Sequence, residues 1–152
     1  MSPAIFHIVD TFEHDGQLRY EFDEVHAAGG NCTVGSDWPV TETPNLLPAL
    51  ASIVERITVD PTQLDKSQAP SFKTKTPKEI GGEILCRLIT LGSAELLGKG
   101  HETGSIEPGK RANFIQVDHD LSKGEFLDAH VLKTWFEGEL VWDMDGEFRL
   151  SV

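Results

Sequence analysis

Apolar residues recur at helical spacing in one stretch that begins near the middle of the first half of the chain. Asn45 stands before it and can accept hydrogen bonds from first-turn N–H groups as an N-cap. Pro48 is tolerated because the first-turn N–H groups lack intrahelical partners. The pattern predicts a helix whose apolar face consists of Leu46, Leu50, Ile53, Val54 and Ile57.

A second helical pattern starts with a strong boundary signal. Residues 76–79 read TPKE, a capping box with proline at the first helical position. The pattern predicts a long helix that ends near Gly98, with an apolar face made of Ile80, Ile84, Leu85, Leu88 and Ile89.

The apolar period changes to two in the last third of the chain. Turn residues occupy 104–109, and strands are expected over 112–117, 131–136, 139–142 and 147–150. Glu137 with Gly138, and Asp145 with Gly146, mark the turns between the later strands. This part is expected to form a small antiparallel meander.

The first third is less regular. Residues 1–19 predict loop or a single weak strand, and 20–28 a short helix stopped by Gly29 and Gly30. A strand is expected over 31–36, ending where Pro39 forbids further pairing. Residues 58–75 are polar and contain Pro61 and Pro70, which is typical of a long loop that serves as a lid or a linker.

Charge and composition exclude several classes of protein. Apolar residues are 39% and charged residues 25% of the chain, which indicates a folded globular protein. The formal charge of −12 repels phosphate backbones and anionic lipids, so neither nucleic acid nor membrane is an expected partner. No apolar run is long enough for a membrane span and no leader pattern is visible, so a cytoplasmic location is the default interpretation. Cys32 and Cys86 are expected to be buried free thiols.

The candidate for chemistry is Asp37, directly after the strand expected over 31–36. Most Asp residues in such a position cap a turn through the side chain. In a parallel α/β barrel, however, the carboxyl ends of strands are where catalytic groups gather. A carboxylate there can bind a metal ion or take a proton.

Three segments resemble one known family. Residues 35–40 (GSDWPV) with Asn45 are similar to the last barrel strand of the metal-dependent amidohydrolase 3 group. Residues 88–94 (LITLGSA) and 104–112 (GSIEPGKRA) resemble the segment that links barrel and β domain, and 131–142 its final hairpin, so the likeness covers about 20–143. Asn113 departs from the Asp that the family usually has there, in the β domain and away from the site.

The resemblance implies a fold and a role for Asp37. The fold class would be α/β: the terminal βα part of a (β/α)8 amidohydrolase barrel, a long helix, and a small antiparallel β segment of the C-terminal composite β-sandwich domain. The barrel part would be residues 1–98 and the β segment 99–152. In the intact family the matching Asp ligates a divalent metal, zinc, and handles the proton of the water that cleaves a small-molecule amide at a non-peptide carbon–nitrogen bond.

Most of the family's other ligands have no counterpart in this sequence. The family begins with a His-x-His pair, whereas no two of the six histidines stand two or four positions apart, and we expect them to be surface or loop residues. A complete barrel takes about 250 residues. We therefore expect a truncated C-terminal fragment, inactive and without bound metal when alone. The alternative is a non-catalytic remnant that serves as a binding or assembly module and self-associates through open strand edges.

The three tryptophans are assigned structural roles. Trp38 stands beside a proline in an apolar setting, which favours packing in the core over lining a substrate pocket. Trp135 and Trp142 are expected to pack across neighbouring strands.

Overall fold

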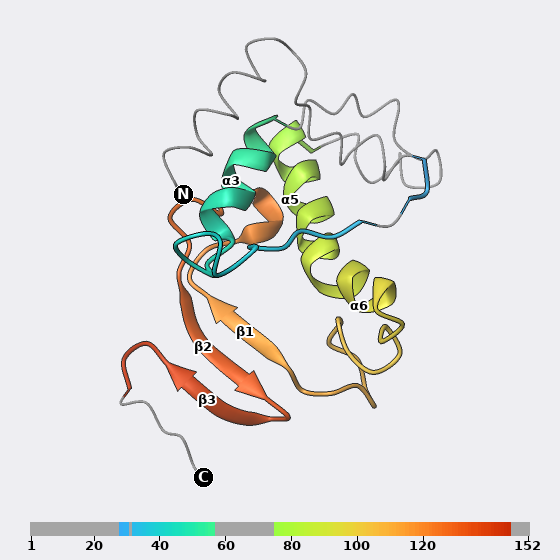
Figure 1. Ribbon diagram of the computed structural model, residues 1–152, viewed down its shortest axis with the longest axis vertical. Helices are drawn as coiled ribbons and strands as arrows, with labels where there is room; N and C mark the ends of the chain where they lie inside the picture. Colours follow the sequence, from blue (N-terminus) through green and yellow to red (C-terminus); the bar gives the residue numbers. More distant parts are fainter. Residues whose placement is uncertain (1–27, 31, 57–74, 147–152) are drawn as a thin grey trace.

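The computed structural model describes residues 28–30, 32–56 and 75–146. In this part the chain is mixed α/β, with a helical layer beside a three-stranded antiparallel sheet (Figure 1). The main elements are α3 (Leu47–Arg56), α5 (Pro77–Arg87), β1 (Phe114–Val117), β2 (Val131–Phe136) and β3 (Glu139–Asp143). The expected helix over 20–27, the loop over 58–74 and the strand over 147–150 lie outside the described residues. The division at residue 98 stays a prediction.

Helix α3 confirms the first helical pattern. The Asn45 side chain accepts a hydrogen bond from the N–H of Leu47 at 3.1 Å, and Pro48 lies in the first turn. The face that packs inward contains Leu47, Leu50, Ala51, Ile53 and Val54, all buried.

Helix α5 begins as the capping box predicts. The hydroxyl of Thr76 accepts from the N–H of Glu79 at 3.2 Å, and the Glu79 carboxylate accepts from the N–H of Thr76 at 2.7 Å. Pro77 occupies the first turn. Two donors that a helix start leaves unpaired are thereby satisfied.

The helix does not continue uniformly to its end. Leu88–Gly92 forms a wider π turn, η1, before the helical segment α6 (Ser93–Leu96). The N–H of Ser93 reaches back five residues to the carbonyl of Leu88, which also accepts from the Ser93 hydroxyl at 2.5 Å.

The core lies between α3, α5 and a loop that crosses both. The loop carries the short 3₁₀ helix η2 (Leu121–Lys123) and then Phe126, whose side chain is fully buried. Gly82 on α5 lets this loop approach closely, because a Cβ there would lie 2.6 Å from the carbonyl oxygen of Ser122. The remaining core side chains on the second helix are Ile80, Ile84, Leu85 and Leu88.

The sheet confirms the predicted meander from 112 to 143. Its order is β1-β2-β3 with antiparallel pairing throughout, and Phe114 stacks on Trp135 with ring centroids 4.8 Å apart. Trp142 lies opposite Thr134. Within the described residues β1 and β3 are edge strands, so open edges are present, and self-association through them stays a prediction.

The turn between β2 and β3 is the one that the sequence indicates. Glu137 and Gly138 both have positive φ, 52° and 84°, as a two-residue hairpin turn that follows the sheet twist requires. Asn113 belongs to the β part, as expected, and its side-chain oxygen accepts from the N–H of Glu137 at 2.7 Å. The carboxyl oxygen of an Asp could accept the same bond.

The strand expected over 31–36 is absent from its described part. Residues 32–36 have no strand assignment and lie beside the helical layer without a neighbouring strand among the described residues. A strand is defined by hydrogen bonds to a partner, so the favourable sequence Cys-Thr-Val is insufficient by itself. Cys32 and Val34 instead pack, partly buried, against the core.

None of the helices in the described residues is long and apolar enough to cross a membrane.

Candidate functional site

Asp37 lies at the start of a tight turn that follows the extended segment. Its backbone φ is 55°, a left-handed conformation that Asp tolerates better than most residues. Its carbonyl accepts from the N–H groups of Val40 at 2.8 Å and Thr41 at 3.3 Å. The Thr41 hydroxyl donates to the carbonyl of Ser36 at 2.7 Å, so the turn is closed from both sides.

The segment before this turn is fastened to the π turn of the helical layer. The Thr33 hydroxyl contacts the hydroxyl of Ser93 and lies 3.4 Å from the carbonyl of Leu88. Side chains two residues apart on this segment, Cys32 and Val34, pack against the core. The position of the turn that carries Asp37 is therefore set by the helical layer.

The side chain of Asp37 is exposed, and within the described residues it has no hydrogen-bonding or ionic partner. The turn-capping role that the residue type favours is thus carried by its backbone carbonyl. The carboxylate itself remains available to a ligand or to a proton.

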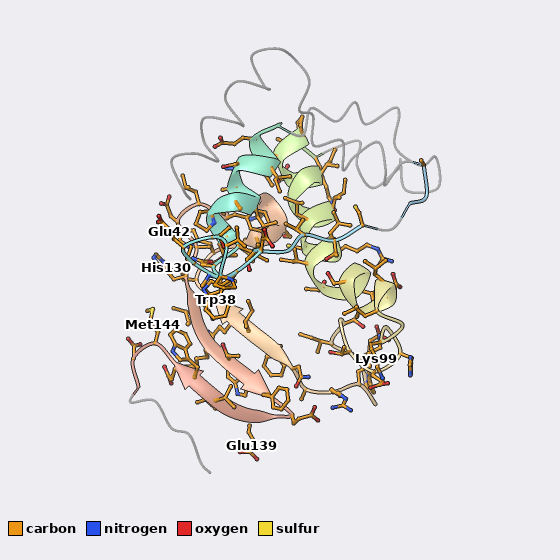
Figure 2. All side chains as sticks on the ribbon, in the orientation of Figure 1. Trp38, Glu42, Lys99, His130, Glu139 and Met144 are labelled. Carbon is orange, nitrogen blue, oxygen red and sulfur yellow. The ribbon has the colours of Figure 1, made fainter. Side chains whose placement is uncertain are left out.

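Trp38 does not pack in the core, so that expectation is wrong. Its side chain is 61% exposed, and Val40 on the same turn is 66% exposed. Figure 2 shows Trp38 between the 37–44 loop and the tip of β1 in this view. The apolar neighbours in the sequence turn away from it, because Val34 faces the core and Val40 faces solvent.

The described residues do not form a complete metal centre. A catalytic zinc normally takes three protein ligands and a water molecule. Among the residues that the structure describes, no group of three or more His, Cys, Asp or Glu side chains is arranged to hold a metal ion. Asp37 can supply one ligand, and the described residues do not supply the others around it.

A second polar cluster lies at the base of the crossing loop, where sequence analysis did not place one. Asp118 Oδ1 lies 2.7 Å from His119 Nδ1 and accepts from the His130 N–H at 2.7 Å, while Oδ2 lies 3.0 Å from His130 Nδ1. The hydrogen bond from His119 is the main cause that holds the pKa of Asp118 far below its ordinary range. The same bond raises the pKa of His119. Asp118 and His130 are 12 positions apart, so no local motif announces their contact.

The histidines of this cluster are at the surface, as expected. The side chain of His119 is 39% exposed and that of His130 65%, and His101 is also exposed. His7, His14 and His26 lie outside the described residues.

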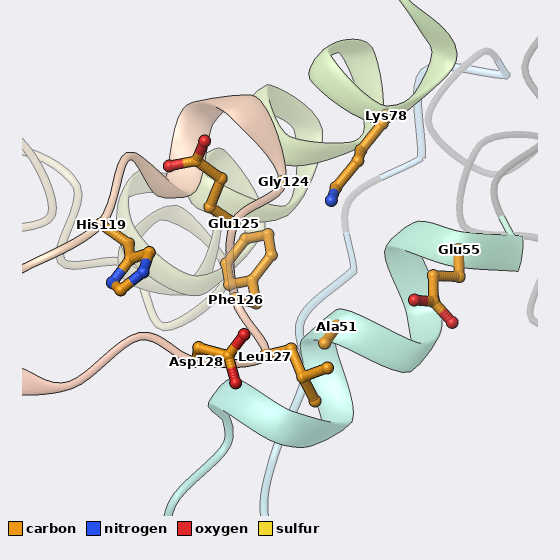
Figure 3. Close-up of a pocket in the computed structure, with 9 residues that line it drawn as sticks. All are labelled: Ala51, Glu55, Lys78, His119, Gly124, Glu125, Phe126, Leu127 and Asp128. Atoms are coloured by element: carbon orange, nitrogen blue, oxygen red, sulfur yellow. The ribbon is translucent and has the colours of Figure 1, made fainter.

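A cavity of about 260 Å³ lies next to this cluster and does not include Asp37. Figure 3 shows Glu55 from α3, Lys78 from α5 and Asp128 from the crossing loop around it. Both charge signs line it, and Phe126 forms part of its wall. It is a surface hollow between packed elements, separate from the turn that carries the candidate carboxylate.

Neither cysteine is a nucleophile candidate. Both thiols are free and partly buried, which confirms the absence of a disulfide and places them less deeply than expected. Burial raises the pKa of Cys86 to about 11 and also raises that of Cys32. A raised pKa keeps a thiol protonated and unreactive.

An exposed carboxylate on a turn fixed to a helical layer is a site feature of hydrolases that assemble their centre from several strands and loops. The chain belongs to the amidohydrolase family, whose model matches residues 4–142. It is 40% identical over 63 residues to an N-substituted formamide deformylase from Arthrobacter pascens, a stretch that covers 40% of this chain and 12% of the relative. The crystal structure of an amidohydrolase from Thermotoga maritima MSB8 aligns with 73% of this chain and 29% of that chain, at 18% identity and a TM-score of 0.34. The chain spans about an eighth of the length of the curated relative.

Proposed function

We propose that this chain contributes one carboxylate, Asp37, to an amidohydrolase site that hydrolyses a non-peptide carbon–nitrogen bond in a small-molecule amide. The observation that carries the proposal is the exposed, unpartnered Asp37 side chain on a fixed turn in a chain that belongs to the family. The similarity to a protein named for deformylation of N-substituted formamides supports an amide as substrate.

The chemistry proposed for Asp37 is proton handling. Water adds to the amide carbon and loses a proton, the carbon–nitrogen bond breaks, and the leaving amine gains a proton. A carboxylate beside the water can take the first proton and return it to the amine. Such a group must reach the water by hydrogen bonding, which an exposed side chain on a rigid turn can do.

The proposal includes the family's divalent metal, with Asp37 as one of its ligands. Because the described residues do not form a metal centre, the proposal requires the remaining ligands to come from outside them. The fold role goes with it: the segment from 32 to the turn would be the last strand of a barrel, paired once its neighbours are present. The β part would belong to the composite β-sandwich domain.

The test is a fusion in which the full chain replaces the corresponding C-terminal portion of the Arthrobacter pascens deformylase. We expect amine release from an N-substituted formamide, and a decrease of about 100-fold or more in kcat/KM for Asp37→Asn, which is the range for loss of a general base. The matched control is Asp145→Asn, an exposed carboxylate in the turn after β3, which should leave kcat/KM unchanged.

The isolated chain supplies an independent measurement. Elemental analysis should find less than one zinc ion per purified chain. The proposal is wrong if the Asp37→Asn fusion is as active as its parent, or if the chain alone holds stoichiometric zinc and hydrolyses amides.

A further inference from the structure

We infer that the substrate is an uncharged amide with an apolar nitrogen substituent, and that Trp38 is the residue that receives this substituent. The inference rests on the proposed function and adds to it a substrate class and a specificity-determining residue. It follows from three properties of the turn that carries Asp37.

The first property is the exposure of the indole. A tryptophan contributes a large apolar surface, and a side chain that is 61% exposed leaves most of that surface in water. Single exposed apolar residues are ordinary, but Trp38 and Val40 are exposed together on one short turn. An apolar patch of this kind on a loop is typical of a contact that ligand binding completes.

The second property is the fixed relation of the indole to the carboxylate. Trp38 follows Asp37 directly, and the hydrogen bonds from Val40 and Thr41 to the Asp37 carbonyl close the turn that holds both. The N–H of Trp38 also donates to the Ser36 hydroxyl at 3.3 Å. An amide whose carbon is attacked beside Asp37 would therefore have its nitrogen substituent within reach of the neighbouring indole.

The third property is charge. Asp37 and Glu42 are the ionisable side chains of the 32–46 segment, and the sequence has no Lys or Arg between Arg19 and Arg56. The chain as a whole carries −12. A substituent that bears a carboxylate would meet like charges at this turn, so an uncharged substituent is favoured.

The experiment compares three formamides in the fusion described above. N-methylformamide has almost no substituent, N-(2-phenylethyl)formamide has an apolar one, and N-formylphenylalanine adds a carboxylate to the same skeleton. The parent fusion should prefer the phenylethyl compound over the other two by about tenfold or more in kcat/KM, the scale of a few apolar contacts.

The variants then separate a substrate contact from a packing role. Trp38→Ala should lower kcat/KM for the phenylethyl compound by about tenfold or more, mainly through KM, and that for N-methylformamide by less than about threefold. Trp38→Phe should restore most of the preference, and Val40→Ala, which removes an equally exposed side chain, should keep it. Equal losses on all three substrates would show that Trp38 serves packing and would overturn the inference.

A titration of the full chain alone keeps the inference independent of catalysis. The Trp38 indole N–H signal, assigned by its disappearance in Trp38→Phe, should shift with N-(2-phenylethyl)formamide and far less with the other two compounds. The same titration of Asp37→Asn should give the same shift. A fusion without turnover on any amide counts against the proposed function, whereas a Trp38 signal that shifts no more than that of Trp135 counts against the subsite.

Discussion

Replacement of Gly82 by alanine separates two effects that act in opposite directions. Gly82 lies inside α5, where alanine is the better helix former by about 1 kcal/mol. On helix propensity alone the substitution should therefore stabilise the protein. The packing of α5 against the crossing loop predicts the reverse.

The methyl group would collide with backbone atoms that cannot rotate away. It would lie 2.6 Å from the carbonyl oxygen of Ser122, 2.8 Å from that of Leu121, and closer still to the amide nitrogen of Gly124. Overpacking of this kind costs about 1–3 kcal/mol, and a contact with three rigid atoms belongs at the upper end. The loop must move, and with it the buried Phe126.

The net effect follows by subtraction. A cost of about 3 kcal/mol less a gain of about 1 kcal/mol leaves a destabilisation of about 2 kcal/mol. For a chain of 152 residues this corresponds to a decrease in Tm of about 4–8 °C.

The assay is urea unfolding followed by circular dichroism, with a thermal scan of the same samples. Gly35→Ala is the matched control, since a Cβ there has open space and the residue has no positive φ, and its free energy of unfolding should change by less than about 0.5 kcal/mol. A Gly82→Ala protein as stable as the parent, or more stable, would refute the packing argument.

Two further predictions concern the ends of these elements. Thr76→Ala removes the capping box and should lower the free energy of unfolding by about 1 kcal/mol, whereas Thr90→Ala, which removes an exposed hydroxyl bonded to the Cys86 carbonyl, should be close to neutral; equal losses in urea would contradict the capping role. Asp118→Asn should lower Tm in a pH-dependent manner. Asp118 has a lowered pKa, so its contribution is present above its ordinary value of 3.8 and is lost as pH falls; His119 has a raised pKa, so its contribution is full below 6.5 and is lost as pH rises. The Tm difference from the parent should be widest between about pH 4 and 6.5, and a difference that is constant from pH 4 to 9 would exclude the pairing.

The parts of the fold that the sequence predicts are those fixed by local chemistry. The start of α5 is defined by Thr76 and Glu79 three residues apart, and the β2–β3 turn by Glu137 with Gly138. Each depends on hydrogen bonds or backbone angles within a few residues. The family resemblance is also confirmed, because it rests on short strings whose order and spacing are preserved.

The parts that the sequence misses depend on distant neighbours. Residues 32–36 have strand-forming side chains, but pairing requires a partner that the described residues do not offer. Phe126 stands alone in a polar stretch, so no period marks it as the most deeply buried aromatic side chain of the described core. The exposure of Trp38 likewise follows from how its turn sits on the helical layer.

The candidate site shows the same division. Asp37 could be selected from the string around it, and its position after an extended segment is as expected. The closure of its turn, and its left-handed backbone, depend on Thr41 and on the anchorage of Thr33, which no local pattern announces.

The π turn at Leu88–Gly92 is equivalent to one extra residue in an otherwise regular helix. Deletion of a single residue there would restore the regular winding, but it would rotate everything that follows by about 100° about the helix axis. Ser93 would then point away from Thr33, and the chain would enter β1 from another direction. One surplus residue thus keeps the catalytic-side turn and the sheet in a common frame, and a family sequence that lacks it must reorient both.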